Sequence, residues 1–144
     1  MRKIWFEDFA LGIFVKVFVT PDLFDYLVDH GVNFFGIEPK LYMEERTSNT
    51  VNIVPPHNAD PSVWIYNISD EDILYFLRQA ALHDLRVMIK PFLTGKQWKF
   101  YAPKINPSNP EQWFDSYGDA LVHYAELTNQ VDNPDIILLS LIHI

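Results

Sequence analysis

The chain of 144 residues contains no cysteine, which excludes a disulfide scaffold, a thiolate metal site and a cysteine nucleophile. Basic residues are also few, since 11 Lys and Arg stand against 19 Asp and Glu, for a net charge of −8. Binding to phosphate backbones needs clustered basic side chains, so nucleic acid is not an expected partner. None of the five glycines forms a Gly-rich phosphate turn after a strand, so no nucleotide cofactor is expected.

Long hydrophobic runs are missing as well. The longest, residues 9–19, is interrupted by Lys16 and is shorter than the ~20 residues that span a bilayer, so no membrane partner is expected. Residues 1–3 resemble the basic start of a signal peptide, but Glu7 and Asp8 interrupt the apolar stretch that should follow. The sequence therefore leaves export open. Hydrophobic residues nevertheless make up 49% of the chain, enough for a folded core.

Helical and strand patterns alternate along the chain. Helices are expected from Thr20 to Gly31, from Ser69 to about Leu85 and from Asn109 to about Tyr124; strands are expected at 32–37, 86–89 and 136–139, with another within 3–19. The first two of these strands are expected to end at Glu38-Pro39 and Lys90-Pro91, because proline cannot donate to a strand ladder. Alternation of this kind predicts a parallel sheet with covering helices.

Two architectures fit this order, an open doubly wound sheet and a (β/α)₈ barrel. The helix-to-strand turns are tight, whereas the strand-to-helix connections, roughly 39–68 and 91–108, are long, as they are where barrel enzymes build active sites. A whole barrel needs about 250 residues. We therefore expect α/β architecture, the amino-terminal half of a TIM barrel. Residues 1–144 would be a single partial domain of about four β/α units.

The expected site lies on the two long connections and at the strand ends. Aromatic residues are frequent there, namely Tyr42, Trp64 and Tyr66 in the first and Trp98, Phe100 and Tyr101 in the second. Such rings either stack on sugars or fill the space beneath a loop. Glu38 and Lys90 each end a strand, and neighbouring strands about 4.8 Å apart would let them form an ion pair. That pair either binds substrate or closes the barrel structurally.

Other chemistries find little support. The five histidines have no metal-ligand spacing, so no metal is expected. Glycoside hydrolysis uses two carboxylates about 5 to 9.5 Å apart, and Glu38 is the one acid that can be placed at a strand end. No Gly-x-Ser-x-Gly elbow is present. Asn67-Ile68-Ser69 matches the N-glycosylation pattern, a frequent chance match.

Several segments resemble glycoside hydrolase family 113, a β-mannanase-like group of (β/α)₈ enzymes. They are Gly31–Phe35, Ser69–Ile73, Ala80–Pro91, Trp98, Trp113–Tyr117 and His123–Ala125, and the resemblance runs from about Gly31 to Asp135. Phe92 stands where the family usually has histidine, and Asp84 where it usually has glycine. The resemblance implies a retaining hydrolase of β-mannan-type polysaccharide. We take Lys90, Trp98, Glu38, Tyr42 and Phe92 as candidate substrate-binding residues.

The resemblance also implies a general-acid glutamate after the strand that begins at Asp135, and a nucleophile glutamate further on. Neither is found there, and residues 139–144 resemble a reading frame that has entered foreign sequence. The chain alone is therefore expected to lack hydrolase activity. Two alternatives stay open: a non-catalytic carbohydrate-binding module, and a structural half-barrel that self-associates through exposed sheet edges.

Overall fold

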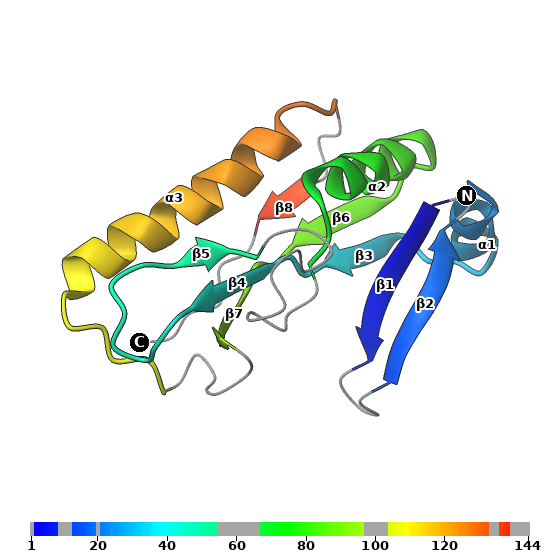
Figure 1. Ribbon diagram of the computed structural model, residues 1–144. Coiled ribbons are helices and arrows are strands. Elements are labelled where there is room, and N and C mark those ends of the chain that lie inside the picture. Colours follow the sequence, from blue (N-terminus) through cyan, green and yellow to red (C-terminus); the bar gives the residue numbers. More distant parts are fainter. Residues whose placement is uncertain are drawn as a thin grey trace.

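The computed structural model describes residues 2–8, 13–19, 21–54, 67–96, 104–132 and 136–138. Their elements in chain order are β1 (Arg2–Asp8), β2 (Ile13–Val19), α1 (Pro21–Asp29), β3 (Phe34–Ile37), β4 (Lys40–Met43), β5 (Asn52–Ile53), α2 (Asp70–Leu82), β6 (Arg86–Ile89), β7 (Phe92–Gly95), α3 (Pro110–Thr128) and β8 (Ile136–Leu138). Figure 1 shows α2 and α3 lying along the same side of the strands.

The sheet that defines the fold is parallel. Its strand order is β3-β6-β8, and β6 pairs with both neighbours in parallel. Each step from one strand to the next passes through a helix, α2 and then α3. This is the repeated β/α unit expected from the alternating sequence pattern. The structure therefore confirms a parallel sheet with covering helices.

The strands end where the prolines predicted, β3 at Ile37 and β6 at Ile89, but the pairing does not stop there. After Pro39 and Pro91 the same two chains pair again, as β4 and β7, also in parallel. Two backbone bonds join the segments: the Lys90 amide donates to the Ile37 carbonyl at 2.8 Å, and the Phe92 amide to the Pro39 carbonyl at 2.8 Å. The missing amide hydrogen of Pro39 removes one rung and divides the ladder without ending it. Figure 1 shows β4 and β7 extending the course of β3 and β6.

The short strand β5 joins the sheet of β4 and β7, and the hairpin of β1 and β2 comes before them in the chain. β5 pairs antiparallel with β4, through Leu41 opposite Ile53 and Tyr42 opposite Asn52. We expected a single strand within residues 3–19. The structure has two there, β1 and β2, which pair with each other antiparallel in a sheet of their own.

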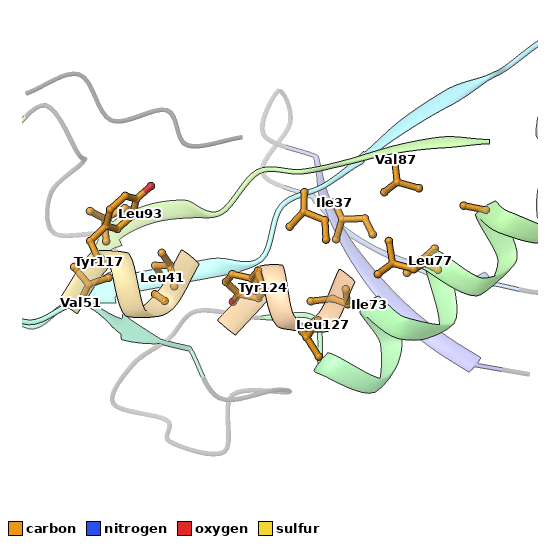
Figure 2. Packing of buried hydrophobic residues seen from close by; sticks show 14 of the residues in the cluster. Ile37, Leu41, Val51, Ile73, Leu77, Val87, Leu93, Tyr117, Tyr124 and Leu127 are labelled. Carbon is orange, nitrogen blue, oxygen red and sulfur yellow. The ribbon is translucent and has the colours of Figure 1, made fainter. Parts of the chain in front are cut away.

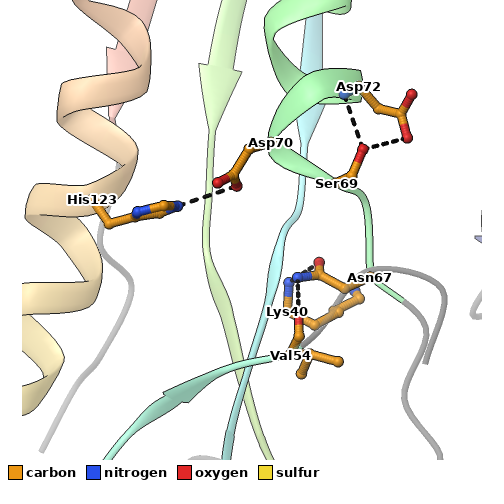
Figure 3. A network of polar contacts seen from close by, with 7 residues as sticks. All are labelled: Lys40, Val54, Asn67, Ser69, Asp70, Asp72 and His123. Carbon is orange, nitrogen blue, oxygen red and sulfur yellow. Dashed lines mark hydrogen bonds and ion pairs between the residues drawn. The ribbon is translucent and has the colours of Figure 1, made fainter. Parts of the chain in front are cut away.

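The helix ends follow the capping signals in the sequence. Gly31 has φ 77° after α1, the left-handed cap that its position predicted. The Ser69 side chain accepts from the Asp72 amide at 3.1 Å before α2, and the Asn109 side chain accepts from the Gln112 amide at 3.2 Å before α3. Ser69 also donates to the Asp72 carboxylate, as Figure 3 shows. These bonds satisfy amides that the first turn leaves unpaired.

The core lies between the helices and one face of the strands. On the two long strand pairs the odd-numbered residues face it, and Figure 2 shows Ile37, Leu41, Val87 and Leu93 directed toward side chains of the helices. Trp113 of α3 is fully buried and its indole N–H lies 3.2 Å from the sulfur of Met43. Alternation of odd residues inward and even residues outward continues across Pro39 and Pro91, because strand side chains alternate with a period of two.

The even-numbered residues line the opposite face, called here the open face. From β3 onward they are Phe34, Gly36, Glu38, Lys40 and Tyr42, and from β6 onward Arg86, Met88, Lys90, Phe92 and Thr94. Near the start of the strands this face is exposed in the described part of the chain, with Phe34 39% accessible. Tyr42, expected in a loop, belongs to β4 and is half-buried.

Candidate functional site on the open face

The site is built around an ion pair between Glu38 and Lys90. Each residue directly follows a strand, β3 or β6, and the pairing of Ile37 with Ile89 places the two side by side. The Lys90 ammonium contacts Glu38 Oε1, with the side chains 26% and 38% exposed. The predicted ion pair is therefore confirmed. It remains accessible from the open face, and exposed pairs of this kind add only about 0.2–1 kcal/mol to stability.

Lys40 belongs to the same cluster as Glu38, and the sequence pattern did not predict it. Its ammonium lies 3.8 Å from Glu38 Oε2, so one carboxylate contacts two lysines. The Lys40 side chain is only 9% exposed, and burying an ammonium is costly unless charges or π-electrons compensate. The alternation of the strand carried through Pro39 would have placed Lys40 on the face of Glu38. The expectation that pairing stops at Pro39 excluded this placement, whereas β4 resumes the pairing at Lys40.

Phe92 and Tyr42 flank these charges. Phe92 pairs with Lys40 across β4 and β7, and the Lys40 ammonium sits 4.7 Å from the centroid of the Phe92 ring. This is a cation–π contact. Tyr42 lies one step further along the same face, opposite Thr94. Four of the five candidate residues, Glu38, Lys90, Tyr42 and Phe92, are thus found on the open face.

The fifth candidate, Trp98, lies outside the described residues, as do Trp64, Tyr66, Phe100 and Tyr101. Their predicted role in sugar stacking stays a prediction. The last described residue before Trp98 is Lys96, whose ammonium contacts Glu44 at 2.8 and 3.1 Å. Glu44 directly follows β4 and Lys96 directly follows β7. A second ion pair, Glu44–Lys96, therefore links the ends of β4 and β7, further along the two chains than the Glu38–Lys90 pair.

No group of three or more His, Asp or Glu in the described ranges is arranged to hold a metal ion. No helix among the described segments is long and apolar enough to cross a membrane. In the core, burial raises the pKa of the Tyr124 phenol above its ordinary value, and a hydrogen bond with Asn67 acts in the opposite direction.

The parallel strands and their covering helices match part of a TIM barrel. The sequence model of Glycoside Hydrolase Family 113 matches residues 19–138, and the chain belongs to this family. This confirms the resemblance found in the sequence. No curated protein matches the chain.

The solved structures that are similar to the chain include two mannanases. One is the GH113 β-mannanase AaManA from Alicyclobacillus acidocaldarius in complex with ManMIm, with 22% identity and a TM-score of 0.58 over 74% of this chain. The other is a GH113 β-1,4-mannanase, with 18% identity and a TM-score of 0.57 over 76% of this chain. The matched part amounts to 34% and 36% of those chains, so this chain spans about a third of their length. At this identity the likeness establishes the fold.

Proposed function

We propose that the open face of this chain binds β-mannan-type polysaccharide. The observation that carries the proposal is the Glu38–Lys90 ion pair, placed at the carboxyl ends of parallel strands in a member of a glycoside hydrolase family. In TIM barrels this end carries the substrate site, because the rest of each strand is core. Both solved relatives are named as mannanases, which supports mannan as the polymer.

In this proposal each candidate residue has a distinct role. Lys90, whose side chain is 26% exposed, donates hydrogen bonds to sugar hydroxyls, while Glu38 accepts them. Tyr42 offers a ring and a hydroxyl to the same sugar. Phe92, held under Lys40, contributes an apolar contact, and Trp98 stacks on a neighbouring sugar unit.

We further propose that the chain of 144 residues binds without cleaving. Hydrolysis with retention needs one carboxyl group as acid and another as nucleophile. Among the open-face residues named above, Glu38 is the one acid, and its carboxylate is engaged by two ammonium groups. The family glutamate expected after the strand of Asp135 has no counterpart in residues 136–144. Glycoside hydrolysis by a longer protein would depend on an acid and a nucleophile that lie outside these 144 residues.

Calorimetric titration with mannohexaose tests the binding, and a reducing-sugar assay on the same sample tests the chemistry. Lys90→Met is expected to weaken binding by about tenfold, the loss of one charged hydrogen bond. Lys96→Met is the matched control, since it removes the lysine of the second ion pair, which follows β4 and β7. Equal affinity of the Lys90 and Lys96 variants would contradict the proposal, and release of reducing ends would contradict the lack of catalysis.

A second candidate function is structural: self-association into a larger assembly. β3 and β8 form the two edges of the described parallel sheet, and unpaired edges add strands from another copy. Sedimentation at two concentrations tests this, with a concentration-dependent dimer expected. A monomer at both concentrations would rule it out.

A further inference from the structure

Asn67 connects two strands that do not complete their own ladder. β5 pairs with β4 up to Leu41 opposite Ile53, and the next pair in register is Lys40 opposite Val54. Only one direct bond is made there, from the Val54 amide to the Lys40 carbonyl at 3.1 Å. In an antiparallel pair the two residues would exchange two such bonds. The second is replaced by a side chain.

That side chain is the carboxamide of Asn67, as Figure 3 shows. Its Oδ1 accepts from the Lys40 amide at 2.7 Å, and its Nδ2 donates to the Val54 carbonyl at 2.7 Å. Three bonds therefore form a closed ring through Lys40, Asn67 and Val54. The orientation of the amide is fixed by chemistry, because the Lys40 N–H can only donate and the Val54 C=O can only accept.

This ring lies directly under the site. Lys40 and Val54 are buried, with 7% and 0% exposure, so water does not substitute readily for a lost partner. The backbone that Asn67 holds belongs to the residue whose ammonium contacts Glu38 and covers the Phe92 ring. A carboxamide presents one donor and one acceptor at the spacing of a peptide group, a combination that Asp and Leu lack.

We propose that Asn67 is the positioning residue of the open-face site. Its carboxamide replaces one rung of the β4–β5 ladder and thereby fixes Lys40 against Glu38 and Phe92. The role in sugar binding rests on the proposed function. The match of residues 67–69 to the glycosylation pattern is then incidental. Nδ2 of Asn67 donates to the Val54 carbonyl, and the Ser69 hydroxyl caps α2.

The first test uses the unaltered chain in solution. NMR couplings transmitted through hydrogen bonds are expected from the Lys40 amide to the Asn67 side-chain carbonyl and from Asn67 Nδ2 to the Val54 carbonyl. Absence of both couplings, with the coupling from the Val54 amide to Lys40 present, would overturn the proposal. This measurement needs no variant and no ligand.

The second test compares Asn67→Ala with two controls, Asn129→Ala on the exposed end of α3 and Gly31→Ala, which lowers stability away from the site. Asn67→Ala is expected to speed hydrogen exchange at the Lys40 amide about tenfold, to shift the Lys40 Nζ resonance and to weaken mannohexaose binding about fivefold. The Lys40 Nζ resonance should not move in either control.

Equal changes in Asn67→Ala and Gly31→Ala would show that Asn67 only stabilises the fold. If the unaltered chain binds no mannohexaose, the proposed function fails, while the exchange and resonance data still decide the role of Asn67.

Discussion

Gly31 and Asp84 occupy equivalent places after two successive helices, and both have a left-handed backbone, with φ of 77° and 55°. The Val32 amide donates to Leu27 after the first helix, and the Leu85 amide to Ala80 after the second, each at 2.9 Å. Both turns therefore close in the same way. Only the first has the residue that this backbone favours.

Exchanging residue types at these two turns should have opposite effects. Gly31→Ala should lower the free energy of unfolding by about 1 kcal/mol, because a Cβ disfavours positive φ. No heavy atom lies within 4 Å of the added carbon, so the loss is conformational rather than steric. Asp84→Gly should raise stability by up to about 1 kcal/mol, since it also removes an acid from a helix C-terminus. Urea unfolding measures both, and a stabilising Gly31→Ala would contradict the assignment.

Leu41 and Leu82 provide a test of the core. Leu41 of β4 is completely buried in the core, whereas Leu82 is 76% exposed at the end of α2. Leu41→Ala should cost about 2–5 kcal/mol, as cavity-forming substitutions do. Leu82→Ala should change stability by less than about 0.5 kcal/mol. Thermal unfolding of the two variants against the unaltered chain distinguishes them, and similar losses would contradict the assigned strand face.

The Tyr124 phenol predicts a loss of stability at high pH. Its pKa is 10.0 when unperturbed and is raised in the folded chain by burial. Above pH 10 the unfolded chain therefore binds fewer protons than the folded chain, and stability falls as pH rises. Tyr124→Phe should reduce this fall between pH 10 and 11.5, measured by urea unfolding. An unchanged slope would show that the phenol titrates normally.

The sequence predicted the architecture well because its signals are local. Each helix begins at a residue that favours a helix start: Pro21 in α1, Ser69 before α2 and Asn109 before α3. The apolar runs after Gly31 and Leu85 form strands, as their sequences predicted. The extension of the strands beyond Pro39 and Pro91 was missed. A proline was expected to end pairing, but it removes only one rung when the flanking residues still pair.

The site was only partly predictable. Glu38 and Lys90 could be placed together because both directly follow strands that share a sheet. Lys40 depended on the continuation of β4 past the proline. Asn67 could not have been found, since its partners lie 27 and 13 residues away and no pattern in the sequence indicates that the strands need a side chain between them.

The most direct test of the account is the affinity of mannohexaose for the unaltered chain, for Lys90→Met and for Lys96→Met, measured by calorimetry at low salt. The account predicts saturable binding by the unaltered chain, the same affinity for Lys96→Met, and about a tenfold weaker affinity for Lys90→Met. No saturable binding by the folded chain, or equal affinity for all three proteins, would contradict a sugar site at Glu38 and Lys90.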